Sequence, residues 1–143
     1  MKFLVGAILA ICAVLTFQHA VPAQPVAGPS VQALYDSYNA AYFSDRLPPI
    51  EVVLTTPPPI GNEELEGETI HAVGGHWYKI YISPKYNITG DQQAETVLHE
   101  MCHVKTWEDA EASGVSYDGG GHGAPWQGCM LGLAKQGAFA SIW

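Results

Sequence analysis

Two histidines and a glutamate lie close together in the segment His99-Glu100-Met101-Cys102-His103. In a helix, residues four positions apart lie on one face, so His99 and His103 can reach one metal ion while Glu100 projects beside them. This H-E-x-x-H pattern is typical of zinc hydrolases, in which the glutamate serves as the general base. A catalytic zinc ion takes three protein ligands and leaves its fourth position to water. The pattern therefore predicts a zinc site whose third ligand lies elsewhere in the chain.

His122 is the best candidate for that third ligand. Glycines precede and follow it, and they free the backbone to approach a metal ion. Three other side chains remain alternatives, namely Asp118, His71 and His76. Both histidines of this set flank a predicted turn, where they would be solvated or would line the cleft.

The motif lies within the longest predicted helix, which ends near Ala112. Thr89 or Asp91 can cap its start, and Gln92 stands three residues after Thr89, as a capping box requires. Gly114 can take the left-handed conformation that ends many helices. An apolar stripe predicts that one face of this helix is buried, and its members are Val97, Leu98, Met101, Val104 and Trp107.

Two shorter helices and three strands are predicted around it. Ser30 can cap a first helix, which has helical apolar spacing and ends near Phe43. A last helix is expected at residues 124–137. Strands are predicted at residues 50–55, 69–73 and 76–83. Since Gly74-Gly75 separates the second and third strands, those two should form a β-hairpin.

Two loops carry features that invite a functional interpretation. Residues 63–68 include four glutamates, which predict a solvated loop, and their spacing fits no dedicated calcium loop. Asn87-Ile88-Thr89 is an acceptor sequence for N-linked glycosylation in a host that glycosylates its secreted proteins.

The start of the chain has the layout of a secretory signal. A basic start at Met1-Lys2-Phe3 precedes an apolar run over residues 4–17, and small residues follow up to Ala23. We expect residues 1–23 to be a signal peptide cleaved near Ala23, residues 24–30 to be an extended leader, and residues 31–143 to form one domain. The apolar run is too short for a stable membrane anchor. The protein is therefore expected to be secreted or periplasmic.

Two cysteines remain after such a cleavage, Cys102 and Cys129. In an oxidising compartment an even pair is a candidate disulfide. Two buried free thiols are an equally open alternative, and ligation of zinc by a Cys102 thiolate is a third.

Composition and charge favour a globular protein that does not bind nucleic acid. Hydrophobic residues make up 48% of the chain and charged residues only 14%, which argues against a disordered chain. With 14 acidic and 6 basic side chains the formal net charge is −8, so the surface should repel phosphate backbones.

Three sequence blocks resemble the SprT-like metalloprotease domain, the family that includes the Spartan protease. The blocks are Leu34-Tyr35 with Tyr38-Asn39-Ala40-Ala41-Tyr42-Phe43 and Arg46-Leu47-Pro48, then His99-Glu100-Met101-Cys102-His103, then Gly121-His122-Gly123-Ala124-Pro125-Trp126. The resemblance implies an α+β, minigluzincin-like fold, in which a small β-sheet packs against the zinc-binding helix. It also implies that His122 is the third zinc ligand and Glu100 the general base. The DNA-repair role of intracellular members is not carried over, because this chain is acidic and starts with a signal sequence.

Together these features predict a secreted, zinc-dependent endopeptidase that acts as a monomer on a protein or peptide substrate. Glu100 would take a proton from a zinc-activated water. The strand at residues 76–83 would form the sheet edge that holds the substrate, and Tyr117, His76 and Tyr78 are candidates for stabilising the oxyanion. Two alternatives are a secreted zinc-binding module without proteolysis and a zinc amidase that acts on cell-wall peptides.

Overall fold

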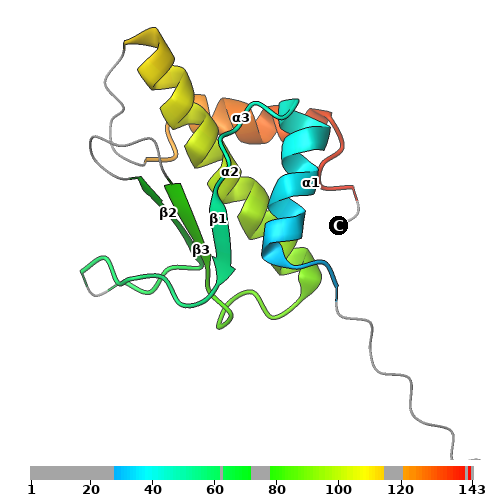
Figure 1. Ribbon diagram of the computed structural model, residues 1–143, viewed down its shortest axis with the longest axis vertical. Coiled ribbons are helices and arrows are strands. Elements are labelled where there is room, and N and C mark those ends of the chain that lie inside the picture. The colour runs from blue at the N-terminus through cyan, green and yellow to red at the C-terminus, as the bar shows by residue number, and fades with distance from the viewer. Residues whose placement is uncertain (1–27, 62, 72–77, 115–120, 141, 143) are drawn as a thin grey trace, which may run out of the picture.

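The computed structural model describes residues 28–140 and 142, except residues 62, 72–77 and 115–120. The predicted signal peptide and most of the leader lie outside this part of the chain. The described residues form three helices and three strands in the order α1, β1, β2, β3, α2, α3 (Figure 1). This α+β architecture, with a small sheet packed against the motif helix, confirms the expected fold class. No helix among the described residues combines the length and apolarity that crossing a membrane requires.

Helix α1 (Val31–Phe43) and the loop after it are fixed by side-chain hydrogen bonds. Ser30 accepts a hydrogen bond from the Ala33 backbone N–H and caps α1, as predicted. The side-chain amide of Asn39 bonds both the N–H and the carbonyl of Leu47, each at 3.1 Å. The Tyr35 hydroxyl donates to the Pro48 carbonyl at 2.7 Å. The first resemblance block therefore sets the path of the chain into β1.

The three strands form one sheet in the order β1-β3-β2 (Figure 1). Strand β1 (Glu51–Leu54) runs parallel to β3 (Tyr78–Ile82), while β2 (Gly67–His71) runs antiparallel to β3 with His71 opposite Tyr78. The hairpin partners are as predicted, and the Gly74-Gly75 turn lies outside the described residues. The expected edge strand is wrong: β3 is central and paired on both sides, so β2 is the edge nearest the motif helix.

The two sheet edges differ in what covers them. The side-chain amide of Gln32 in α1 accepts from the N–H of Val52 at 2.9 Å and donates to the carbonyl of Ile50 at 3.1 Å. This amide takes the place of a neighbouring strand along β1. Strand β2 has no neighbouring strand on its outer side among the described residues. Its outer backbone groups are therefore available for other hydrogen bonds.

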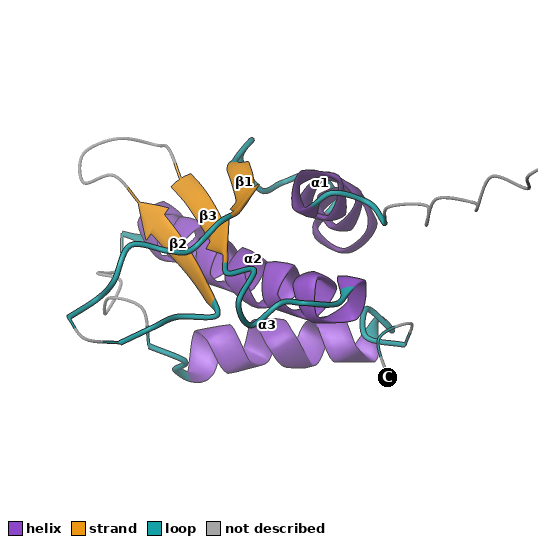
Figure 2. Cartoon of the chain, turned by 90° about the horizontal axis from the view of Figure 1, so that it is seen from below, coloured by secondary structure: helices purple, strands orange, loops and turns teal. Residues whose placement is uncertain are grey.

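Helix α2 (Gly90–Ser113) is the centre of the molecule. Figure 2 shows it between the sheet on one side and α3 on the other. Its start has the predicted capping box between Thr89 and Gln92, and Gly114 ends it in the left-handed conformation at φ 65°. Residues of α2 and β3 that share the core are fully buried, and they are Ile80, Ile82, Val97, Leu98, Met101, Cys102 and Val104.

Helix α3 (Ala124–Lys135) ends two residues before the predicted end at Gly137. Leu133 is its one fully buried residue, while most of its first two turns is exposed. Apolar burial alone therefore attaches the start of α3 to the body of the protein only weakly.

Asn87 is a structural residue, and its acceptor sequence is not usable in the folded protein. Only 3% of its surface is exposed. Its amide donates to the carbonyls of Glu66 and Ser83, both at 2.9 Å, and accepts from the Thr96 hydroxyl. A glycan on this amide nitrogen would break the bonds that hold the start of β2 to α2.

Candidate metal centre

Three imidazoles converge at one point of the structure. His99 and His103 lie one turn apart on α2, and His122 reaches them from the segment that precedes α3. The Nε2 atom of His99 lies 3.3 Å from Nε2 of His103 and 3.0 Å from Nε2 of His122. One ring nitrogen from each residue can be chosen so that all three lie within 4.8 Å of one another. The structure therefore brings together the three histidines that the sequence predicted.

This cluster fits a tetrahedral zinc ion. Nitrogen ligands at about 2.0 to 2.1 Å from one tetrahedral zinc lie about 3.3 Å from each other. The Nε2 separations from His99, 3.3 Å and 3.0 Å, agree with this geometry, whereas the widest separation within the cluster, 4.8 Å, would have to shorten around a bound ion. His71 does not belong to the cluster, so that alternative for the third ligand is wrong. Asp118 and His76, the other two alternatives, lie outside the described residues.

Burial keeps two of these imidazoles neutral. Loss of water, together with the neighbouring imidazoles of His103 and His122, lowers the pKa of His99 to about 4. Loss of water and the proximity of His122 lower the pKa of His103 to about 4. A neutral imidazole has the free lone pair that a metal ion needs. In the metal-free protein, His99 and His103 therefore keep their free lone pairs in mildly acidic solution.

The start of α3 positions His122. The indole of Trp126 lies against all three imidazoles, with ring centroids 4.4 Å from His122, 4.7 Å from His99 and 5.7 Å from His103. Its N–H donates to the His99 carbonyl at 3.3 Å. The side chain of Gln127 donates to the His122 carbonyl at 2.8 Å. His122 is exposed. Its orientation therefore depends largely on these contacts from α3.

Glu100 lies beside the cluster and is only 4% exposed. Its Oε2 accepts a hydrogen bond from the hydroxyl of Thr69 in β2 at 2.7 Å. Burial raises the pKa of Glu100 to about 7, with a smaller contribution from the charge of Glu68, while the Thr69 bond opposes the rise. A carboxyl group with a pKa near neutrality suits proton transfer. Sequence reasoning missed Thr69, whose only signal was its place in a predicted strand.

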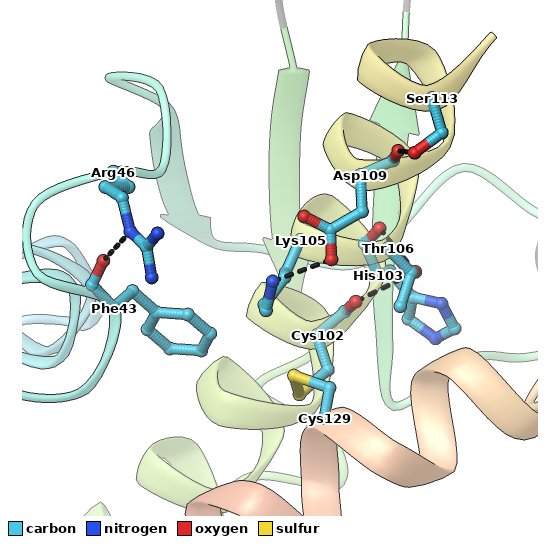
Figure 3. Close-up of polar contacts among 9 residues, drawn as sticks. All are labelled: Phe43, Arg46, Cys102, His103, Lys105, Thr106, Asp109, Ser113 and Cys129. Carbon is cyan, nitrogen blue, oxygen red and sulfur yellow. Dashed lines mark hydrogen bonds and ion pairs between the residues drawn. A yellow bond between two sulfur atoms is a disulfide. The ribbon is translucent and has the colours of Figure 1, made fainter.

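A disulfide joins the motif helix to α3. Cys102 and Cys129 are bonded, with Cα atoms 5.7 Å apart, which decides between the three alternatives for these cysteines. Figure 3 shows Cys102 directed toward Cys129 while the imidazole of His103 points to another side of α2. The bridge starts one residue before a histidine of the cluster and ends within the helix that positions His122.

A cleft of about 370 Å³ opens onto the three imidazoles and Glu100. Strand β2 forms one wall of the cleft, and its odd-numbered residues face α2. Gly67 and Thr69 lie against Glu100. His71 packs on Trp107. Tyr78 also lines the cleft, but its hydroxyl donates to Glu108 at 2.7 Å and the residue is buried, which argues against a role at the oxyanion. The other oxyanion candidates, Tyr117 and His76, lie outside the described residues.

Comparison with known families decides the classification. The profile of the SprT-like family matches residues 31–141, most of the chain. The chain belongs to the SprT-like family. No curated protein gives a significant match. SprT-like domains are associated with metallopeptidase-like activity, so the histidine cluster is the candidate metal centre of this SprT-like protein.

Gly67 is a second residue of the SprT-like site that sequence reasoning missed, because it lies inside the acidic segment predicted to be a loop. A Cβ atom on Gly67 would lie 2.6 Å from Cγ2 of Thr96 and 2.7 Å from Oε1 of Glu100. Such distances are shorter than van der Waals contact, so the Glu100 carboxylate would have to move. The backbone of β2 approaches the carboxylate this closely only because position 67 has no side chain.

Gly67→Ala should therefore reduce any hydrolytic activity by about 100-fold, because displacement of a catalytic group by even 1 Å is costly. Steady-state kinetics would measure the loss, and thermal unfolding would show whether the fold persists. Gly128→Ala is the matched control, since a Cβ atom there meets no atom within 4 Å. Equal activity of the two variants would show that the close approach at Gly67 is irrelevant.

The raised pKa of Glu100 also predicts a stability effect in the metal-free protein. The folded state binds this proton more tightly than the unfolded chain, so ionisation between pH 4.5 and about 7 lowers the free energy of unfolding. At pH 8, metal-free Glu100→Gln should be more stable than wild type by about 3 kcal/mol, since each unit of pKa difference corresponds to about 1.4 kcal/mol. The difference should shrink toward zero as the pH falls through this window. Urea denaturation of both proteins at several pH values would measure it, and a difference independent of pH would contradict the prediction.

Proposed function

We propose that this SprT-like protein is a secreted or periplasmic zinc-dependent endopeptidase. The observation that supports this most strongly is the convergence of His99, His103 and His122 beside the buried carboxyl group of Glu100. Three imidazole nitrogen ligands with a general base next to them are the components of a catalytic zinc site. The three imidazoles would hold the ion, and a bound zinc ion supplies Lewis-acid chemistry, lowering the pKa of water and polarising a peptide carbonyl.

Glu100 is the proton carrier in this proposal. It accepts a proton from the attacking water and then donates it to the leaving amine. The Thr69 hydroxyl holds the carboxyl group in place through the bond to Oε2. The outer edge of β2, which lies next to this carboxylate, binds the substrate in extended form through backbone hydrogen bonds. This edge replaces the one expected from the sequence.

Two features support a location outside the cytosol. The apolar run over residues 4–17 has the length of the apolar region of a signal sequence. The disulfide between Cys102 and Cys129 is a type of bond that persists in oxidising compartments. The net charge of −8 does not favour a nucleic-acid partner, so we propose a protein or peptide substrate without DNA.

The proposal is tested by metal analysis combined with digestion of casein. Purified protein should contain one zinc ion, lose casein-degrading activity with a chelator and regain it when zinc is restored. His122→Ala should lose both zinc and activity. A protein that binds zinc but digests neither casein nor cell wall would be a binding module, whereas digestion of cell wall alone would identify an amidase. Either of these outcomes would overturn the endopeptidase proposal.

A further inference from the structure

The cleft at the metal centre continues along α2 in both directions. One part, of about 390 Å³, reaches toward the start of α2 and includes Gln92 and Glu95. The other part, of about 370 Å³, reaches toward the end of α2 and includes Trp107. Trp107 follows His103 by four residues, so its side chain lies one turn further along the same face of the helix. Both parts include the same residues of the metal centre, and these are His99, Glu100 and His122. A peptide that crosses the metal centre would therefore contact both parts.

Apolar side chains dominate the part of the cleft near Trp107. Ile60 and Leu65 line it from the segment before β2. Ile60 is 58% exposed, so a ligand in the cleft can bury apolar surface that water now covers. The ring of His71 packs on those of Tyr78 and Trp107, with centroid distances of 4.5 Å and 4.3 Å. We call these five residues the apolar subsite, and they are Ile60, Leu65, His71, Tyr78 and Trp107.

The polar groups of the apolar subsite have partners within the protein or are buried. The Tyr78 hydroxyl donates to Glu108 at 2.7 Å, and the Trp107 indole N–H donates to Glu111 at 3.2 Å. Both ring nitrogens of His71 are buried, so this ring offers the cleft no hydrogen-bonding atom. A polar ligand group placed here would lose its bonds to water without replacement. The subsite therefore favours an apolar side chain over a polar one.

Glu68 does not add a charge to the apolar subsite. It belongs to the lining of the cleft, but strand alternation directs its side chain away from the face that Thr69 and His71 share. Its cross-strand partner is Tyr81, and the Lys79 ammonium group lies 5.5 Å from the centre of the Tyr81 ring. The carboxylate of Glu68 thus belongs to the opposite face of the sheet. The charged groups that the described residues direct into this part of the cleft are then those of the metal centre.

The part of the cleft near the start of α2 has a more polar lining. Tyr86, Gln92 and Glu95 contribute to it, and Leu65 is its one large aliphatic side chain among the described residues. A carboxylate such as that of Glu95 keeps its water poorly when an apolar group packs against it. A large apolar side chain of a substrate is therefore accommodated better beside Trp107 than on this side of the metal centre.

The direction of β2 decides which substrate residues reach the apolar subsite. Gly67 lies against Glu100 and His71 against Trp107, so β2 and α2 advance past the metal centre in the same direction. Antiparallel strand pairs are more stable per residue than parallel pairs and are more common. A substrate that pairs in this way with the outer edge of β2 runs from Trp107 toward Gly67. The residues that precede the cleaved bond then lie on the side of the apolar subsite, and alternate side chains among them point toward α2.

We propose that the apolar subsite binds a large apolar side chain of the substrate, on one of the two residues that precede the cleaved bond. The proposal rests on the endopeptidase function proposed above and adds a substrate class to it. That class consists of peptides with leucine, isoleucine, methionine or phenylalanine at one of these two positions. The enzyme would cut the bond that follows such a residue or the next bond along the chain.

A peptide of alanine and serine with a single central leucine tests this preference. Its partner carries alanine in place of the leucine, and mass spectrometry identifies the bond that is cut. Wild type should cut the bond after the leucine or the next one, and it should prefer this peptide by about tenfold or more in kcat/KM. Cleavage on the N-terminal side of the leucine would overturn the proposal. Equal rates on the two peptides would also overturn it.

Ile60→Asp tests the subsite itself. The new carboxylate would lie against the apolar side chain of the substrate, so the preference for leucine should fall below about threefold. Ile88→Asp is the matched control, because Ile88 is 78% exposed and lines neither part of the cleft. It adds the same charge and should keep the preference of wild type. Thermal unfolding of Ile60→Asp establishes that the variant is folded.

Two results with these variants would contradict the proposal. A full preference for leucine in Ile60→Asp would show that the substrate side chain binds elsewhere. Equal loss of the preference in both variants would show that the effect comes from overall charge.

A binding measurement keeps this test separate from the proposed function. Zinc-loaded Glu100→Gln is titrated with the two peptides by calorimetry, alone and combined with Ile60→Asp. Leucine-dependent binding that disappears with Ile60→Asp would support the subsite even if wild type hydrolysed no peptide, an outcome in which only the endopeptidase proposal would fail. Binding that is independent of the leucine would overturn the subsite whether or not the peptides are cleaved.

Discussion

Glu100→Gln should keep zinc bound and lower kcat/KM on casein-derived peptides by about 100- to 10,000-fold, the range expected for loss of a general acid and base. Zinc should stay because the metal-binding group consists of three histidines and does not include the carboxylate. The glutamine side chain has the shape of glutamate, so it fits the space next to Gly67 and can still accept from Thr69. What it loses is the ability to carry a proton.

The measurement combines metal analysis of the purified variant with initial rates. Thr69→Val is the companion variant, because it keeps the shape of the side chain and removes only the hydroxyl that bonds Glu100. It should show a smaller loss than Glu100→Gln. The stability gain expected for metal-free Glu100→Gln argues that its lost activity will not be caused by unfolding. Full activity of this variant would show that another group moves the proton.

Removal of the Cys102–Cys129 bridge should weaken both the fold and the metal site. The bridge closes a chain segment with a sequence separation of 27 residues. A loop of that size corresponds to about 3.5 kcal/mol of stabilisation through restriction of the unfolded chain. The same segment contains His103 and His122, and α3 buries only Leu133 fully. Without the bridge, the start of α3 would be held mainly by Trp126, so zinc affinity should fall.

The double variant Cys102→Ala, Cys129→Ala avoids a free thiol next to His103. Denaturation in urea would measure its stability, and competition with a chromophoric chelator would measure its zinc affinity. Cys129 lines a groove of about 310 Å³, so a dithiol reductant should reach the bridge in wild type. Reduced wild type should resemble the double variant, which should itself be insensitive to reductant. Unchanged zinc affinity after removal of the bridge would show that packing alone positions His122.

Local patterns predicted much of this structure because they depend on residues close in sequence. The capping box of Thr89 and Gln92 depends on residues three positions apart. The spacing of His99 and His103 likewise follows from a single helix. His122 was found by the glycines around it and by the resemblance to the family.

What the sequence did not reveal depends on contacts between distant segments. The bond between Thr69 and Glu100 joins residues 31 positions apart. The parallel pairing of β1 with β3 places β2 at the edge, and no local pattern encodes that order. The disulfide could not be separated from free thiols without the distance between α2 and α3. In each case, packing of whole elements supplied the missing information.

The unequal covering of the two sheet edges also bears on self-association of the protein. The backbone of β1 is occupied by the amide of Gln32, whereas the outer side of β2 has no neighbouring strand among the described residues. An uncovered edge can pair with the same edge of a second molecule and start aggregation. The acidic residues of the segment 63–68 lead into this edge and would repel an approaching copy. The carboxylates that precede β2 would thus discourage self-association at the edge that we propose as the substrate-binding edge.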